Sequence, residues 1–229
     1  MKTFTILLLG LTILSCNQSE SKQEKIITAE KQIMTTNQIS TQQDTITELL
    51  NKALISDTTE FYDWKRNPSF LFFKSGNFLN NTEKNAMVVF GSTDSTYSIK
   101  LYSIKDKKWF VTDIINDLYL LPVFFNSRFD DYNFDNQTDI YLQVSASNGY
   151  SLSIGYLLTI DPKTKKFSEH LEARELANMK PDTRKKVVIS EKVIWCKNNG
   201  ELKVCKLTNK WVEGIIKTIK EECPCEPEQ

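Results

Sequence analysis

The chain has 229 residues, and its 29 lysine and arginine residues balance 29 aspartate and glutamate residues to a formal net charge of zero. A nucleic-acid-binding domain normally carries a surplus of basic residues, so this balance argues against nucleic acid as a partner. Five cysteines and one histidine leave few side chains for a histidine-based or zinc-based active site.

The N-terminal residues have the layout of an export signal. Lys2 precedes an apolar run of 11 residues from Phe4 to Leu14, which is too short to span a bilayer. At the end of this run, Ile13-Leu14-Ser15-Cys16 resembles the lipobox of bacterial lipoproteins. We therefore predict a signal peptide over 1–15 and a lipidated Cys16, whose acyl chains hold the protein to a membrane. A core helix and an ordinary secretory signal are the alternatives.

A polar segment follows the signal. Between residues 17 and 44, 15 of 28 residues are Asn, Gln, Ser or Thr, and none is aromatic. Such a composition buries too little apolar surface to offset the entropy of ordering. We predict a flexible tether over 16–44, a single β-rich domain over 45–222 and a Cys-Pro-Cys tail over 223–229. We expect the protein in the bacterial cell envelope, anchored to the outer membrane and facing either the periplasm or the cell surface.

The domain is predicted to be all-β, a mainly antiparallel sandwich or meander with one or two short helices. Residues 45–55 have apolar side chains near helical spacing, and 169–179 is compatible with a second helix or a long loop. Short segments rich in β-branched and aromatic residues alternate with turn signals, which is typical of strands. These segments are 69–73, 85–92, 96–104, 108–115, 138–147, 150–160, 185–190, 192–197, 201–207 and 210–219.

Four cysteines remain once Cys16 is lipidated, and export to an oxidising compartment favours two disulfides. A type II′ turn at Gly200 would place Cys196 opposite Cys205 at a non-hydrogen-bonded position of a hairpin, within disulfide range. We therefore expect a Cys196–Cys205 bond, with Cys223 and Cys225 closing on each other or partly free. A type I′ turn at 199–200 would break this match, and a four-cysteine zinc site is the rival hypothesis.

The segment DYNFDNQTDIYL (131–142) has the spacing of a calcium loop. Calcium takes six to eight oxygen ligands, which EF-hand loops supply from positions 1, 3, 5, 7 and 9. Those positions are occupied here by Asp131, Asn133, Asp135, the backbone carbonyl of Gln137, and Asp139. We predict that these residues bind Ca²⁺, although the glutamate that an EF-hand has at position 12 is absent.

The acids of this loop could also belong to a metal-free turn or to a catalytic pair. Asp and Asn form turns by bonding their own backbone, but three carboxylates in one tight loop repel each other. A glycosidase needs two carboxylates across a cleft, and these acids are neighbours on one loop. No catalytic residues are assigned, and the chain is predicted not to be an enzyme. His170 is expected at the surface.

A second segment of the chain resembles this loop. GNFLNNTEKNAMVV (76–89) aligns with DDYNFDNQTDIYLQ (130–143) at an offset of 54, with no carboxylate at the four matching positions. Those positions are Asn77, Leu79, Asn81 and Asn85. If the repeat is real, it keeps the turn and loses the metal.

DYNFDNQTDIYL followed by SNGYSLSIGYLLTIDPKTKKF resembles a family of exported bacterial calcium-loop β-proteins. That family includes periplasmic lipoprotein immunity proteins that inhibit peptidoglycan-cleaving effectors, and it is similar in fold to inhibitors of invertebrate-type lysozyme. The resemblance implies an ion site at the residues named above and a muramidase-like partner. It also implies a partner-binding loop at Ser147, Asn148, Gly149 and Tyr150, which otherwise form an Asn-Gly hairpin turn. The alternatives are a degenerate FG-GAP/VCBS-type adhesion or glycan-binding module and a cell-wall glycan hydrolase.

Overall fold

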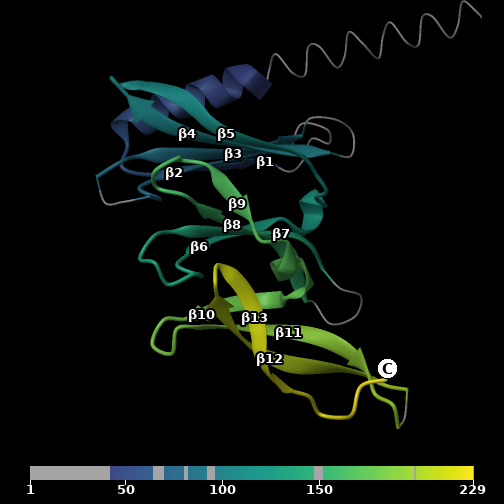
Figure 1. Ribbon diagram of the computed structural model, residues 1–229. Coiled ribbons are helices and arrows are strands. Elements are labelled where there is room, and N and C mark those ends of the chain that lie inside the picture. Colours follow the sequence, from purple (N-terminus) through teal and green to yellow (C-terminus); the bar gives the residue numbers. More distant parts are fainter. Residues whose placement is uncertain are drawn as a thin grey trace, which may run out of the picture. The chain divides into compact units, whose positions relative to one another are not determined.

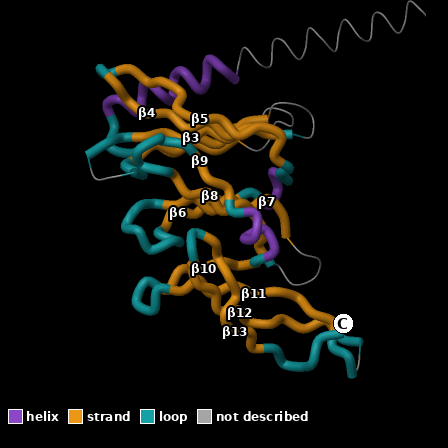
Figure 2. Tube along the Cα trace, viewed as in Figure 1, coloured by secondary structure: helices purple, strands orange, loops and turns teal. Residues whose placement is uncertain are grey.

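The computed structural model describes residues 42–63, 70–79, 82–91, 96–146, 152–198 and 200–228 (Figure 1). Every strand pairing among them is antiparallel. The strands form three sheets, and the one α-helix in this part of the chain covers 42–55 (Figure 2). The prediction of a mainly antiparallel all-β fold is therefore confirmed. The chain divides into two compact units, 1–41 and 42–229, and all described residues belong to the second.

Each sheet is a meander of strands that are consecutive in the chain. The first sheet has the order β1-β2-β3-β4-β5. Its strands are β1 (Thr59–Asp63), β2 (Leu71–Gly76), β3 (Asn85–Gly91), β4 (Tyr97–Lys105) and β5 (Lys108–Leu118).

The second sheet has the order β6-β7-β8-β9 and the third has the order β10-β11-β12-β13. The second contains β6 (Asn126–Asp130), β7 (Asp139–Ala146), β8 (Ser153–Ile160) and β9 (Phe167–Glu169), preceded by the 3-10 turn η1 (Pro122–Phe124). The third contains β10 (Ala177–Asp182), β11 (Val187–Trp195), β12 (Leu202–Val212) and β13 (Ile215–Glu222), preceded by the 3-10 turn η2 (Leu171–Glu175).

Three apolar cores connect the helix and the sheets. The helix packs on one face of the first sheet, where the indole nitrogen Nε1 of Trp109 also donates to the carbonyl of Leu50 at 2.7 Å. The other face of the first sheet shares a core with the second sheet. The opposite face of the second sheet packs on η2 and the third sheet through Tyr141 and Leu157. The second sheet is therefore buried on both faces.

The expected strands are present, with changes at their boundaries. Segments 185–190 and 192–197 join into the single strand β11, and 210–219 is divided by a turn at Glu213-Gly214, where both residues have positive φ. The region 169–179 is not a helix, because it contains the end of β9, η2 and the start of β10. Strands β1, β6, β9 and β10 were not expected.

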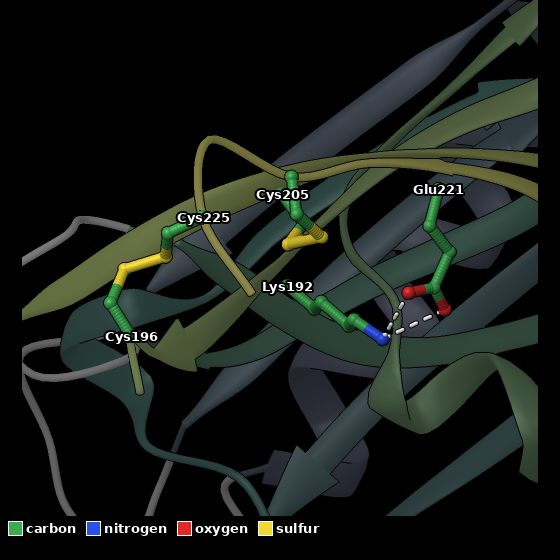
Figure 3. Close-up of a disulfide and its surroundings, with 6 residues drawn as sticks. Lys192, Cys196, Cys205, Glu221 and Cys225 are labelled. Atoms are coloured by element: carbon green, nitrogen blue, oxygen red, sulfur yellow. Dashed lines mark hydrogen bonds and ion pairs between the residues drawn. A yellow bond between two sulfur atoms is a disulfide. The ribbon is translucent and has the colours of Figure 1, made fainter. Parts of the chain in front are cut away.

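The predicted Cys196–Cys205 disulfide is wrong. The bonds are Cys196–Cys225 and Cys205–Cys223, with Cα–Cα distances of 5.7 and 4.3 Å (Figure 3). The hairpin register places Lys192 opposite Cys205 and Trp195 opposite Leu202. Neither a type II′ nor a type I′ two-residue turn fits this register, because Cys196 closes a longer loop by donating its N–H to the Glu201 carbonyl at 2.8 Å.

The C-terminal tail pairs with the end of β11 and the residues that follow it. Cys196 and Pro227 form an antiparallel bridge, and the N–H of Lys197 donates to the Glu226 carbonyl at 3.0 Å. Figure 3 shows both disulfides beside the Lys192–Glu221 ion pair, whose atoms are 2.8 Å apart. The Cys-Pro-Cys segment is thus bonded to Cys205 on β12 and to Cys196, the residue that follows β11.

Each disulfide should contribute about 3 kcal/mol, because loops of this length lose that much entropy in the unfolded chain. We expect the double variants Cys205→Ala/Cys223→Ala and Cys196→Ala/Cys225→Ala to lower the free energy of unfolding by similar amounts in urea titrations. The sequence separations are 18 and 29 residues. A variant pair that unfolds at the parent's urea midpoint would show that its bond does not constrain the unfolded chain.

Candidate calcium loop

The candidate loop connects the two strands β6 and β7. Asp130 pairs with Asp139 at the base of the hairpin, so residues 131–138 form the loop itself. Polar and aromatic residues alternate in its first half, as Asp131, Tyr132, Asn133 and Phe134. This alternation turns the aromatic side chains into the protein, while the oxygen-bearing side chains bond the loop backbone.

The aromatic residues attach the loop to the core between the second and third sheets. Tyr132 is 1% exposed and Phe134 packs against the same core. The indole nitrogen Nε1 of Trp211, on β12, donates to the Tyr132 carbonyl at 2.6 Å. A strand 79 residues away in sequence therefore fixes the position of the loop.

The polar side chains form a ladder of hydrogen bonds with the loop backbone. Asp131 accepts from the N–H groups of Asp135 and Asn136 at 3.1 and 2.9 Å. Asn133 Oδ1 accepts from the Asp135 N–H at 3.0 Å, and Asp135 Oδ1 accepts from the Gln137 N–H at 2.8 Å. Asn136 has φ 67°, in the left-handed region that asparagine tolerates better than most residues.

Asp139 completes this set of hydrogen bonds from the buried side of the loop. Its side chain is almost fully buried, and Oδ2 accepts from the N–H groups of Tyr132 and Asn133 at 2.8 and 2.9 Å. Burial raises the pKa of Asp139 to about 7; the nearby charges of Asp135 and Asp131 add to this, and the two backbone N–H donors oppose it. The loop therefore holds a carboxylate in an environment that disfavours its negative charge.

Several side-chain oxygens of the loop keep lone pairs that no hydrogen bond among the described residues uses. A carboxylate offers about four lone-pair sites, and Asp131 uses one on each oxygen. Described contacts occupy only Oδ2 of Asp139. The side-chain oxygen Oε1 of Gln137 is buried, with no hydrogen-bond partner in the described part of the chain. These oxygens suit a hard cation, although the described residues include no group of three or more His, Cys, Asp or Glu placed to hold a metal.

The sequence echo has a structural counterpart. Gly76 pairs with Asn85 at the base of the β2–β3 hairpin, as Asp130 pairs with Asp139, so the offset of 54 holds at both positions. Asn85 is fully buried like Asp139, but its amide donates to the Ser103 hydroxyl at 2.9 Å. The two hairpin loops also touch, because the Thr138 N–H donates to the Phe78 carbonyl at 3.1 Å. Asn81 lies outside the described residues.

Several predicted sites lie beyond the described ranges. Cys16 and the predicted signal peptide are among them, and so are all four residues of the predicted partner-binding loop, 147–150. Within the described ranges, no helix has both the length and the apolar character needed to cross a membrane.

His170 is not the surface residue that was expected. Its side chain is 13% exposed, and its ring packs edge-on against Trp211 with centroids 4.7 Å apart. Nε2 lies 3.0 Å from the Thr159 hydroxyl, and Nδ1 lies 3.6 Å from a Glu172 carboxylate oxygen. Burial lowers the pKa of His170 below 6.5, and the carboxylates of Glu172 and Glu169 partly oppose this. The histidine thus belongs to the contact between β8, η2 and β12, which residue spacing did not reveal.

Comparison of the chain with protein-family models, with curated proteins and with solved structures found no match.

His170 should make the fold less stable in mild acid. Because its folded pKa lies below 6.5, the unfolded state binds the proton more readily, and stability falls as the pH drops through that value. We expect His170→Gln to lose less stability than the parent when urea unfolding is compared at about pH 7.5 and about pH 5.5.

The control for this comparison is Lys52→Gln, a change at an exposed helix position, which should keep the parent's pH dependence. An identical loss of stability in the parent and in His170→Gln would show that His170 does not titrate differently in the two states.

Proposed function

We propose that this protein is a calcium-binding β-domain, lipid-anchored through Cys16 in the bacterial cell envelope, which acts by binding another molecule. The observation that carries the calcium part is the loop 131–139. There, Asp131, Asn133, Asp135 and Asp139 surround one short stretch of backbone with oxygen atoms. Export to a compartment where calcium is abundant would keep such a site loaded even at moderate affinity.

The β2–β3 hairpin, which matches the candidate loop at an offset of 54, supports ion binding rather than turn formation as the role of Asp131, Asp135 and Asp139. The β2–β3 hairpin has the same base pairing with asparagine in place of the closing aspartate. Its closing side chain is buried on a neutral serine, whereas Asp139 is buried as an acid near two other acids. The carboxylates are therefore dispensable for a hairpin of this kind, and a bound cation would offset their mutual repulsion.

The proposed action is binding without catalysis. The single histidine is mostly covered and engaged with Thr159, Glu172 and Trp211. The acids of the loop bond their own backbone and come from one segment, whereas a glycosidase uses a pair across a cleft.

The proposed partner is a muramidase-like enzyme, and this part rests on the resemblance of 131–167 to the exported calcium-loop family. Ser147 to Tyr150 would then contribute to the inhibitory loop. A degenerate FG-GAP/VCBS-type adhesion or glycan-binding module is the second candidate, favoured by the paired hairpins at the offset of 54.

Calcium should stabilise the full chain. A ligand that binds only the folded state adds about 2.7 kcal/mol at 100 times its Kd, which corresponds to about 5–10 °C in Tm for a domain of this size. We expect Tm to be higher in calcium than in chelator by such an amount, and Asp135→Ala to abolish the difference.

The matched control is Asp161→Ala. Asp161 also bonds the backbone N–H groups of its own turn, with Lys163 and Thr164 both at 2.8 Å, and no ion is proposed there. This variant should keep the calcium shift. Equal Tm values in calcium and chelator for the parent would remove the calcium proposal.

The inhibitor proposal predicts loss of muramidase activity when the full chain is added in calcium. Lysis of a peptidoglycan suspension should be measured with chicken-, goose- and invertebrate-type enzymes and with secreted muramidase effectors. Tyr150→Ala should weaken inhibition without changing the calcium shift in Tm. If no enzyme of this panel slows, the partner is of another class and the adhesion-module alternative takes precedence.

A further inference from the structure

A cavity of about 500 Å³ lies on the third sheet, over the hairpin formed by β10 and β11. Ile189 contributes the apolar part of its lining. The other lining residues are Asn178, Lys180, Pro181, Asp182, Thr183, Arg184, Ser190 and Glu191. The cavity lies apart from the calcium loop in the chain, and no part of the proposed calcium function uses it.

One wall of the cavity is built on an irregular piece of backbone. The β10–β11 register shifts between Ala177 and Lys180, and Asn178 within this bulge has φ 52°. Its side-chain oxygen accepts from the Ser153 N–H at 2.8 Å, and its amide donates to Glu191 Oε2 at 2.6 Å. A bulge re-aims side chains beside a strand, and here it holds Asn178 between the second sheet and the cavity wall.

The charges of the lining are unequally satisfied. Glu191 is engaged by Asn178, and Asp182 accepts from the Lys185 N–H at 3.0 Å with the Lys185 ammonium 3.7 Å away. Among the described residues, no hydrogen bond or ion pair is made by the side chains of Lys180 and Arg184. The charged side chains of the lining that remain available to a ligand are therefore the two cationic ones.

The surrounding sheet strengthens this bias. The whole chain is neutral, but residues 177–222 contain 11 lysines and arginines against six aspartates and glutamates. Lys210 and Lys217 lie directly opposite each other on β12 and β13. Like charges in that position are destabilising. An anion near this face would therefore be attracted by Lys210 and Lys217 as well as by Lys180 and Arg184.

We propose that this cavity binds a small molecule through an anionic group, a carboxylate or a phosphate. Arg184 offers a planar fork that pairs with two oxygens at once, and Lys180 adds a second positive charge. Ile189 suits an apolar ring face, and the spare oxygen of Glu191 suits a hydroxyl donor. An acidic sugar has all three features.

Three matched probes test this proposal on the full chain: glucose, glucuronate and glucose 6-phosphate. We expect amide NMR signals from 178 to 191 to shift with at least one of the two anions and not with glucose. Binding of glucuronate alone assigns a carboxylate, and binding of glucose 6-phosphate alone assigns a phosphate. The double variant Lys180→Gln/Arg184→Gln should weaken the binding by about tenfold or more, because two charge-assisted contacts are lost.

Lys52→Gln/Lys108→Gln is the control with the same change in net charge, made at two exposed positions of the helix and β5. It should bind the anion as the parent does. The proposal is overturned if no probe shifts signals between 178 and 191, if glucose binds as well as the anions, or if both double variants bind equally.

Discussion

Burial of both faces of the second sheet is the constraint on which the rest of the structure depends. On β7 and β8, Ile140, Leu142 and Leu158 face the core shared with the first sheet, while Tyr141 and Leu157 face the third. A sheet covered on both sides has no solvent face, so it fixes the other two sheets as layers around it. The candidate calcium loop ends at Asp139, the first residue of β7, and its position follows from that of the sheet.

The all-β class and most strands could be predicted from the sequence, because a strand buried on both faces is apolar at successive positions, as at Ile140, Tyr141 and Leu142. The layering of three sheets was not predicted. Strand β6 was missed because NSRFD lacks β-branched residues and none of its side chains is fully buried. Strand β10 contains Pro181, which argues against a central strand, and β10 is an edge strand of its sheet. The disulfides were mispaired because the choice of turn set the register, and the tail that provides the true partners lies beyond the hairpin.

The candidate site was predictable only in its local part. Oxygen-bearing residues at alternate positions identified the loop, since that spacing is confined to one segment. The burial of Asp139, the Trp211 bond to Tyr132 and the contact with Phe78 all come from distant strands. The cavity on β10 and β11 was missed for the same reason, because the basic clusters 163–166 and 184–186 look alike as charged turns in the sequence. Only the bulge and the cavity distinguish the second turn.

A calcium ion in the loop 131–139 is the central functional claim, and sensitised terbium emission tests it most directly. Tyr132 lies in the loop and Trp211 bonds its carbonyl, so an ion bound there would receive excitation from either ring. We expect terbium emission on tyrosine or tryptophan excitation of the full chain, displaced by calcium and lost in Asp139→Asn. Emission no stronger than that of free terbium, or emission that calcium does not displace, would contradict the claim.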